Sequence, residues 1–543
     1  MRCCWPLLLS LALAPLRAGE PPAREFALEV QEAEAVSTGW AKLCRAGPRW
    51  ILEQSWPARV ELELTPDSAG RLVGGANLPA GVTARLIGGG DARVQVRLRP
   101  RGPDFVGDWR IVGPAGPLRS GRATWRASEA RAPSPLAAAI GAALEPVAER
   151  GTVSPGSVFN RGRPEQPALI RGRAIFGRMR DLIAGAEHEV LFLTYTWEAG
   201  CKPARQIVDG LRALAAKRKA TGGPPVRAWF MVNGGWFAKR TAIKAMREDL
   251  AQLDLAPWVD VRLVRHKHKL LGALHTKSLV VDGEVAVVTG ANPEAKHDGD
   301  APWYDLGFAV HGQAAWAVRE DFAQVWRKVV HEELPPLALP PAHPDDVPVF
   351  AISRQGRGNP LSRSHQDPQG RAYLAALDGA QRSIRILTPN LNYAPVKEAL
   401  VRAAARGVRV QLVFSLGFNR DAENRILQGG HNAKTATWLG GRILEHDLPP
   451  GRLQVRWYSH DGRLPVDGSG PHAMHAKYLS VDDQLVIVGS TNLDTQSWLH
   501  SRELDLLVDD PATTRGWDAQ VFLPVWERSL PTTRRARELP ALR

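Results

Sequence analysis

An internal repeat with a period of almost 200 residues constrains this chain more than any other feature of its sequence. One copy reads HTKSLVVDGEVAVVTGAN from His275, and the other reads MHAKYLSVDDQLVIVGSTN from Met474. The two histidines, His275 and His475, lie 200 residues apart (475 − 275). A short motif that occurs twice in matching local contexts predicts two copies of one structural unit.

The segments before each copy repeat with almost the same period. Thr194 and Thr388, which end two similar apolar runs, lie 194 residues apart (388 − 194). After each run the pattern predicts a helix and then further apolar strands. The predicted helices cover 205–219 and 396–406, and the predicted strands cover 226–232, 259–264, 408–414 and 453–457. A helix over 313–330 is expected to close the first lobe. The predicted fold class is therefore α/β, with two pseudo-twofold related lobes on mixed sheets.

The remaining segments suggest further domains. Residues 24–130 contain alternating runs such as Arg93 to Leu98, which predict a small β-rich domain, a sandwich or half-barrel of unknown role. A linker rich in Pro, Ser and Gly is expected over 131–165, and the lobes over 166–340 and 347–535. A chain of 543 residues is long enough for several such domains.

The N-terminus has the composition of a secretory signal. Arg2 precedes an apolar run from Trp5 to Ala14 that is too short to span a bilayer. We expect a signal peptide over 1–19 and a secreted or periplasmic protein. The mature chain would keep only Cys44 and Cys201, which could form one disulfide or remain free buried thiols.

The formal net charge of +14 favours anionic partners such as acidic membrane surfaces, nucleic acid or phosphorylated substrates. An arginine-rich composition without any polyanion target explains this charge equally well. The chain also holds 18 Trp against 6 Tyr, and tryptophans on loops would suit a membrane interface.

The repeated motif has a chemical meaning. One residue separates His from Lys in each copy, so both side chains face the same side of an extended strand. Lysine neutralises phosphoryl oxygens, and histidine acts as a nucleophile or as an acid and base near neutral pH. A displacement at phosphorus needs an attacking group on one side and a proton donor on the other, and two facing lobes supply one histidine each.

These segments resemble the signature of the phospholipase D superfamily, His-x-Lys-x4-Asp followed by a Gly-Ser-x-Asn turn. The second copy matches fully, at His475, Lys477, Asp482, Gly489, Ser490 and Asn492. The first copy matches at His275, Lys277, Asp282 and Asn292 but has Thr289-Gly290 at the turn, so a hydroxyl contribution from this lobe is open. The resemblance covers about 165–530 and is strongest to the cardiolipin synthase and bacterial phospholipase branches.

The resemblance implies a covalent phosphohistidine intermediate. It assigns His275 as the nucleophile and His475 as the general acid and base, and near symmetry also allows the reverse. It implies no metal or other cofactor, because the two lysines and the amides of Asn292 and Asn492 stabilise the phosphoryl oxygens.

Four acids belong to this picture. Asp305 and Glu503 follow their histidines by 30 and 28 residues (305 − 275 and 503 − 475). The resemblance places an acid near this spacing, often against the histidine of the opposite lobe, so both are expected to orient histidines; ordinary strand-end carboxylates are the alternative. Asp282 and Asp482 are expected to be structural and to pair with backbone or a cation near the turn.

Other histidines give weaker signals. His431, in a Gly-Gly-His-Asn stretch, could help to bind phosphate, although a plain surface loop is the alternative. The pairs His472-x-x-His475 and His266-x-His268 have the spacing of metal ligands but lack a convincing third ligand, so no metal is expected.

The leading functional hypothesis is a phospholipase D-type phosphodiesterase that hydrolyses or transphosphatidylates glycerophospholipids. Its expected partners are phospholipid and a membrane surface, and one monomer would hold both lobes. The alternative is a cardiolipin synthase-like phosphatidyltransferase. The typical synthase has transmembrane helices at its N-terminus, whereas this chain is expected to have a cleavable signal and a β-rich domain there, and this difference favours hydrolysis. A nuclease is less favoured, because small nucleases of this superfamily are usually single-lobe homodimers. A non-catalytic head-group binder conflicts with two intact His-x-Lys pairs.

Overall fold

The computed structural model describes residues 23–532, except 33–34, 47–48, 55–59, 68–70, 79–90, 102–103, 115, 128–131, 235–240 and 269. The predicted signal peptide and Cys3 and Cys4 lie outside the described residues, as does the side chain of Cys44. The chain forms two compact units, Met1–Pro146 and Val147–Arg543, and each is described by itself.

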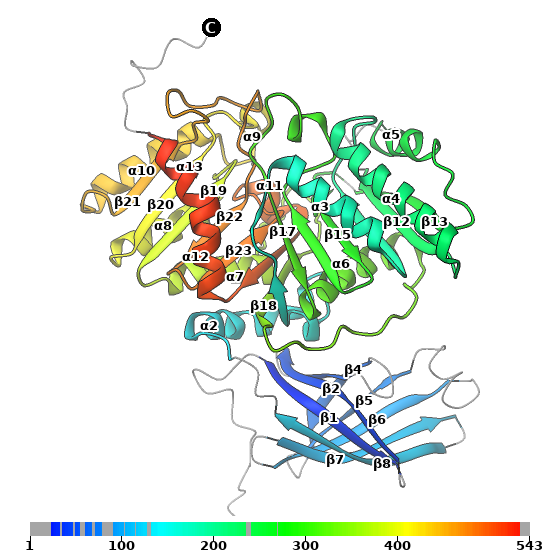
Figure 1. Cartoon of the computed structure of the whole chain (residues 1–543). Helices are drawn as coiled ribbons and strands as arrows, with labels where there is room; N and C mark the ends of the chain where they lie inside the picture. Colours follow the sequence, from blue (N-terminus) through cyan, green and yellow to red (C-terminus); the bar gives the residue numbers. More distant parts are fainter. Residues whose placement is uncertain are drawn as a thin grey trace, which may run out of the picture. The chain divides into compact units, whose positions relative to one another are not determined.

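The first unit is built around a closed antiparallel barrel of eight strands (Figure 1). The strands are β1 (Ala23–Glu32), β2 (Ala35–Ala46), β3 (Arg49–Gln54), β4 (Val60–Pro66), β5 (Leu72–Asn77), β6 (Arg93–Arg101), β7 (Asp104–Gly113) and β8 (Gly116–Ala127). The expectation of a sandwich or half-barrel was wrong, because β1 pairs with β8 and thereby closes the sheet. Closure leaves no unpaired edge strand.

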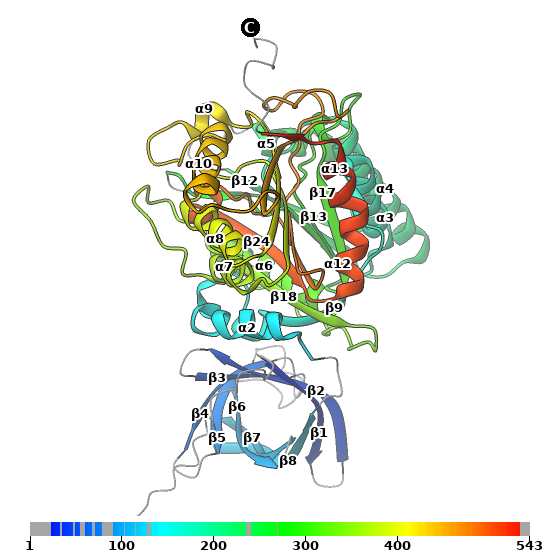
Figure 2. The same ribbon diagram turned by 90° about the vertical axis from the view of Figure 1, so that its left-hand side faces the viewer.

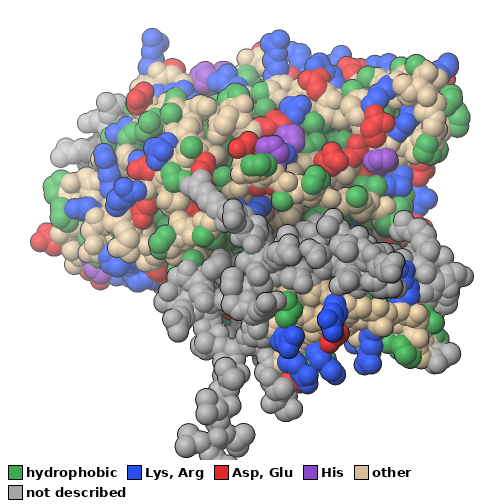
Figure 3. Space-filling view, turned by 60° about the horizontal axis from the view of Figure 1, so that its bottom comes forward, with side chains coloured by type: hydrophobic (Ala, Val, Ile, Leu, Met, Phe, Trp, Pro, Cys, Tyr) green, Lys and Arg blue, Asp and Glu red, His purple; other side chains and the backbone are tan. Residues whose placement is uncertain are grey.

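Alternation along the barrel strands separates a core from a basic outer surface. Val94, Val96 and Leu98 of β6 are buried in the barrel core, while Arg93 and Arg97 on the opposite face of the strand are exposed. Together with arginines of β7 and β8 they line a surface cavity of about 710 Å³. Figure 3 shows Lys and Arg side chains gathered on this part of the molecule. The alternating pattern in the sequence therefore did indicate β-strands with one buried face.

The second unit contains two lobes with the same strand pattern, as the repeat predicts. In the first lobe β11, β12 and β13 are parallel, and β15, β16 and β17 add antiparallel strands. In the second lobe β19, β20 and β21 are parallel, and β22, β23 and β24 are antiparallel. The first set is β11 (Glu189–Thr194), β12 (Val226–Asn233), β13 (Val259–His266), β15 (Ser278–Val281), β16 (Val285–Thr289) and β17 (Leu306–His311). The second set is β19 (Ser383–Thr388), β20 (Arg409–Phe414), β21 (Leu453–Trp457), β22 (Tyr478–Val481), β23 (Leu485–Gly489) and β24 (Ser501–Val508).

Helices cover both sides of this sheet, as Figures 1 and 2 show. Every residue of β11 is buried, which is typical of a strand with helices on both faces. The helices predicted from the repeat are present as α4, α8 and α6, and the α/β class is confirmed. The first lobe has α3 (Arg171–Gly185), α4 (Lys202–Thr221), α5 (Thr241–Leu250) and α6 (Gln313–Val330). The second has α7 (Pro368–Gly379), α8 (Ala394–Ala405), α9 (Arg420–Glu423), α10 (Asn432–Glu445), α11 (Thr495–Leu499), α12 (Pro511–Trp517) and α13 (Leu523–Arg528). Within the described part of the chain, none of the helices is long and apolar enough to cross a bilayer.

The lobes are joined by backbone pairing into one sheet. The strand β9 (Phe159–Pro164) pairs with β17 of the first lobe and with β18 (Val347–Arg354), which in turn pairs with β24 of the second. The short strands β10 (Leu169–Ile170), β14 (Ala273–Leu274) and β25 (Leu530–Pro531) complete the sheet. The expected linker 131–165 therefore contains structure: α2 (Pro135–Leu144), two 3₁₀ turns (Glu145–Arg150 and Pro155–Ser157) and β9. Its Pro, Ser and Gly residues concealed the strand that joins the lobes.

Each lobe uses the aspartate of its motif as a backbone clamp. Asp282 accepts hydrogen bonds from the N–H groups of Glu187, His188 and Glu189, at 2.7–2.8 Å. Asp482 accepts equivalent bonds from the N–H groups of residues 381, 382 and 383, also at 2.7–2.8 Å. These bonds fix the entry into β11 and β19, so both aspartates lie in structural positions that face the backbone.

Replacing Asp482 by alanine should lower the free energy of unfolding by about 3 kcal/mol, because three N–H groups lose a charged acceptor. The backbone adds to the cost, because residue 482 has a φ of +58°, a conformation that alanine disfavours. Asp482→Asn is the matched control, since it keeps an acceptor oxygen and tolerates this φ, and it should lose about 1 kcal/mol. Urea unfolding followed by tryptophan fluorescence measures both values. Equal stability of Asp482→Ala and the unmodified protein would contradict the clamp.

Candidate active site

The fold brings both His-x-Lys motifs to one seam between the lobes. His275 and Lys277 lie between β14 and β15, and His475 and Lys477 lie just before β22. The N–H of His275 donates to Arg502 O (3.0 Å), and the N–H of His475 donates to Tyr304 O (2.8 Å). Each motif is thus hydrogen-bonded to the opposite lobe, and the pseudo-twofold axis that relates the lobes passes through the site.

Each histidine is held by a carboxylate of the other lobe. Nδ1 of His275 lies 2.9 Å and 3.0 Å from the two carboxylate oxygens of Glu503. Nδ1 of His475 lies 2.7 Å from Oδ2 of Asp305. A carboxylate at Nδ1 fixes the tautomer and leaves Nε2 as the atom that can attack or transfer a proton. The structure therefore places Glu503 and Asp305 where the sequence analysis expects orienting acids.

The two carboxylates have different supports. Oγ of Ser490 donates to Glu503 Oε2 (2.6 Å) and accepts from the N–H of Leu504 (3.1 Å). Gly290 occupies the equivalent position in the first lobe, and a Cβ there would overlap Oδ1 of Asp305. The irregular turn of the first copy thus makes room for Asp305, and its own hydroxyl, that of Thr289, donates to Leu306 O (2.6 Å) in place of the carboxylate.

Both lysines are almost fully buried beside the histidines. Lys277 is 2% exposed and Lys477 is 3% exposed. Each ammonium donates to the carbonyl oxygen of its own motif histidine, at 2.6 Å for Lys277. Burial lowers the pKa of Lys277 to about 8 and that of Lys477 to about 7. The negative charge of a bound phosphate would favour the charged form of these buried lysines.

Burial and neighbouring charges shift the pKa values of the acids and imidazoles of the site, and the two acids are shifted in opposite directions. Burial opposes ionisation of Glu503, but the imidazole of His275 beside it holds the pKa of Glu503 below its ordinary value. Burial raises the pKa of Asp305, with Lys477 opposing the rise. Burial also lowers the pKa of both histidines, and for His475 Lys477 and Lys277 add to this effect. The two orienting acids, Glu503 and Asp305, thus have pKa values shifted in opposite directions.

The motif asparagines lie at the same seam. Nδ2 of Asn292 donates to Glu294 (3.2 Å), and Nδ2 of Asn492 donates to Asp494 (3.2 Å). Oδ1 of Asn492 is buried and has no hydrogen-bond partner among the described residues. Both amides are thus held in place by a neighbouring carboxylate. His431 is different: it lies at the start of α10, where none of its described contacts reaches the catalytic histidines.

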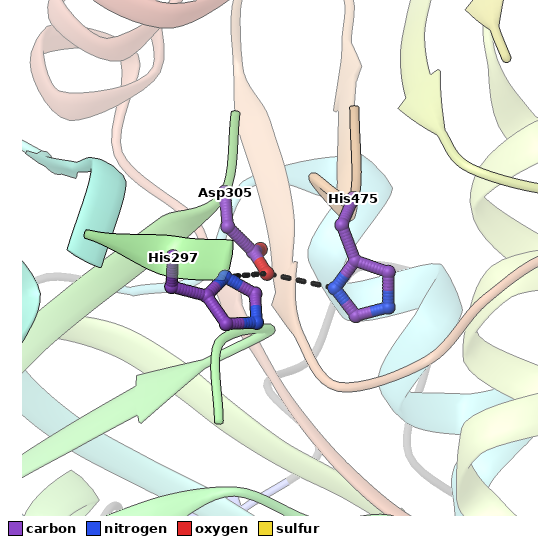
Figure 4. Close-up of side chains that lie close together, drawn as sticks. All are labelled: His297, Asp305 and His475. Carbon is purple, nitrogen blue, oxygen red and sulfur yellow. Dashed lines mark hydrogen bonds and ion pairs between the residues drawn. The ribbon is translucent and has the colours of Figure 1, made fainter. Parts of the chain in front are cut away.

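Sequence reasoning missed a third histidine. His297 is fully buried, and its Nδ1 lies 3.6 Å from Oδ2 of Asp305, on the side opposite His475 (Figure 4). Donor atoms of His297, Asp305 and His475 all lie within 4.8 Å of one another, a set that could hold a metal ion. The surrounding lysines, which lower the pKa of His475, oppose a cation there. Only its place between Asn292 and Asp305 in the sequence could have drawn attention to His297.

The histidine pairs with metal-ligand spacing do not chelate. The rings of His266 and His268 are stacked with centroids 3.8 Å apart, and His472 stacks in the same way on His460. Stacked rings direct their nitrogens past each other, and a single ion cannot bridge them. Within the described residues His266, His268 and His472 belong to no group of three possible ligands, and His475 belongs only to the group with His297 and Asp305.

Aromatic side chains form the walls around the two histidines. The ring of Tyr195 lies 5.5 Å from that of His275, and Trp303 and Phe418 lie 5.6 Å and 5.4 Å from His475. Trp303 and Phe418 also pack against Ala473 in a small apolar cluster. The seam therefore combines cationic and apolar walls, which suits a phosphodiester that carries an apolar group.

Cys201, one of the two cysteines expected in the mature chain, is a free buried thiol at the start of α4.

Comparison with known proteins agrees with the geometry. A family model described as cardiolipin synthase, PLD-like domain, matches residues 373–523. Cardiolipin synthase A of Pseudomonas putida (strain GB-1) is 28% identical over 243 residues, which cover 44% of this chain and 44% of that protein. Cardiolipin synthase A of Pseudomonas fluorescens (strain SBW25) is 25% identical over 353 residues, 63% of this chain and 65% of that protein.

Among solved structures, phosphatidylserine synthase of Haemophilus influenzae Rd KW20 is 15% identical, with a TM-score of 0.45, covering 67% of this chain and 86% of that one. The chain spans 44% of the length of the Pseudomonas putida relative. With its tandem His-x-Lys-x4-Asp motifs and its match to the family model, the chain belongs to the phospholipase D superfamily.

Proposed function

We propose that this enzyme is a phosphatidyltransferase that moves a phosphatidyl group from a phospholipid to an alcohol through a phosphohistidine. The observation that carries the proposal is the pair of histidines at one seam, each held at Nδ1 by a carboxylate of the other lobe. The relatives named cardiolipin synthase A favour an alcohol over water as acceptor, the reverse of the preference drawn from the sequence. Glycerophospholipids remain the proposed substrates.

In the first step Nε2 of His275 attacks phosphorus, and His475 gives its proton to the departing alkoxide. In the second step His475 takes the proton of the acceptor hydroxyl, whose oxygen attacks phosphorus and releases His275. The phosphorylated imidazole carries positive charge, and the anionic Glu503 with Ser490 behind it supports that charge. Lys277, Lys477 and the motif amides stabilise the phosphoryl oxygens.

One chain supplies both motifs, so a complete site needs no second copy. We further propose that the enzyme acts outside the cytoplasm, in the periplasm or secreted, since residues 1–19 have the composition of a signal peptide. A nuclease remains the second candidate, and it rests only on the net charge of +14.

The His275→Ala and His475→Ala variants should lose different steps of the reaction. Each variant should lose about 10³-fold in turnover of phospholipid, because general acid–base and nucleophilic groups contribute on this scale. With a p-nitrophenyl phosphodiester, whose leaving group needs no proton, His475→Ala should still form a covalent adduct on His275. Mass spectrometry of the quenched protein locates the adduct. An adduct on His475 in the His275→Ala variant would reverse the assignment.

The low pKa values of the lysines predict a fall in kcat/KM as pH rises from about 7 to about 8, because Lys477 and then Lys277 lose the charge that binds phosphate. The Lys477→Arg variant keeps its positive charge at alkaline pH, so its fall in kcat/KM should occur at a higher pH. Lys296→Arg is the control, since Lys296 is 37% exposed and ion-paired to Glu294. Steady-state kinetics over pH 6–9 decide the matter, and an unchanged limb in Lys477→Arg would contradict it.

Transfer and hydrolysis can be separated by their products. Vesicles of phosphatidylglycerol, incubated with the protein in EDTA, should yield cardiolipin and glycerol, which thin-layer chromatography and a glycerol assay detect. Phosphatidic acid as the sole lipid product would show that water is the acceptor. Nicking of supercoiled DNA with inert lipid would establish the nuclease instead.

A further inference from the structure

Large apolar side chains that remain exposed are concentrated in one part of the two-lobe unit. Nine such side chains are exposed among the described residues of both units. Six of the nine lie in loops that leave the carboxyl ends of strands: Tyr195, Leu270, Leu361, Ile426, Leu427 and Leu464. Ile426 is 90% exposed and Leu361 is 72% exposed, so neither contributes to the core.

These loops all surround the catalytic seam. The strands β11 and β13 are parallel, as are β20 and β21, so the loops that follow them leave the same end of each sheet as His275 and His475. The strand β18 ends at Arg354, directly opposite Glu503 in the ladder. In Figures 1 and 2, α9, which belongs to the loop after β20, lies at this end of the unit.

We call the described residues of these five loops the mouth rim: residues 195–201, 267–268, 270–272, 355–366, 417–431 and 459–472. Hydrogen bonds link the rim directly and through the loops after β16 and β19. Leu271 N donates to Gly358 O (3.3 Å), and Tyr393 Oη bonds with His365 Nδ1 (2.8 Å). Arg420 pairs with Asp467 (3.0 Å), and Trp303 Nε1 donates to Gly470 O (3.0 Å). The exposed apolar side chains are therefore carried on a connected frame.

The charge of the rim is uneven. The loops 267–272 and 355–366 contain no Asp or Glu, whereas Lys267, Arg357 and Arg363 lie in them. Lys267 and Arg363 are exposed, whereas Arg357 is half-buried and lies 4.0 Å from the carboxylate of Asp367. Protruding leucines thus stand beside basic side chains, the combination by which proteins enter the interface of an anionic membrane. Nucleic acid would use the same cations but has no place for Leu361 or Ile426.

We propose that the mouth rim is a docking surface for an anionic phospholipid bilayer. Leu270, Leu361 and Ile426 enter the head-group region, and Lys267, Arg357 and Arg363 contact anionic head groups. The seam then opens directly onto the membrane, and a lipid reaches His275 without leaving the bilayer surface. This proposal rests on the proposed function, because it takes the substrate to be a membrane lipid.

The test compares binding to vesicles with turnover of a soluble substrate. The double variant Leu361→Ser, Ile426→Ser should bind vesicles of equal phosphatidylcholine and phosphatidylglycerol about tenfold more weakly than the unmodified protein in flotation assays. Its kcat/KM for monomeric dihexanoyl phospholipid should be unchanged. Leu444→Ser is the matched control, since Leu444 is 82% exposed on α10 outside the rim, and it should bind vesicles normally.

Vesicle binding by the double variant equal to that of the unmodified protein would overturn the proposal. So would an equal loss of vesicle binding in Leu444→Ser, or a loss of duplex DNA binding in place of vesicle binding. Rim-dependent binding to vesicles whose lipids are not turned over would leave the docking surface standing and refute the proposed function, so the two failures are distinguishable.

Discussion

The contact between each histidine and a carboxylate of the opposite lobe is the interaction on which the rest of this structure depends. It requires that residues 228 and 170 positions apart along the chain meet within 3 Å, and the backbone makes this possible. Ala273 and Leu274 pair with Ser501 and Arg502, and Tyr304 forms the equivalent bridge with Met474. Neither lobe alone contains an oriented histidine. The duplication therefore generates the site, and both copies of the motif contribute residues to it.

Departures from symmetry give the two halves different chemistry. Ser490 and an anionic Glu503 stand behind His275, whereas Gly290 and Asp305, with a raised pKa, stand behind His475. The pKa of Glu503 is held below its ordinary value and that of Asp305 is raised, so the two histidines do not have equivalent partners. His297, buried against Asp305, has Ser497 at the corresponding position of the second lobe and adds to this difference.

The sequence predicted the repeat, the α/β class, the main strands and the convergence of both motifs, because each depends on local periodicity or on a pattern that occurs twice. The barrel closure was not predictable, since pairing of β1 with β8 is set by strand number and twist, which alternation does not encode. The strand β9 was mistaken for linker because its sequence, Phe-Asn-Arg-Gly-Arg-Pro, lacks apolar alternation. His297 was missed because nothing in its neighbourhood along the chain indicates Asp305, which only the fold brings to it.

The shared strand β9 has a mechanical consequence. Many enzymes built from two lobes bind their substrate in an open cleft and close a hinge around it. Here residues 163–164 of β9 pair with β17 and residues 159–162 pair with β18, so rotation of one lobe against the other would break backbone pairing at this strand. This pairing thus holds the two His-x-Lys motifs together at the seam whether or not a substrate is bound. Movement that admits a substrate would then fall to the loops at the ends of the strands.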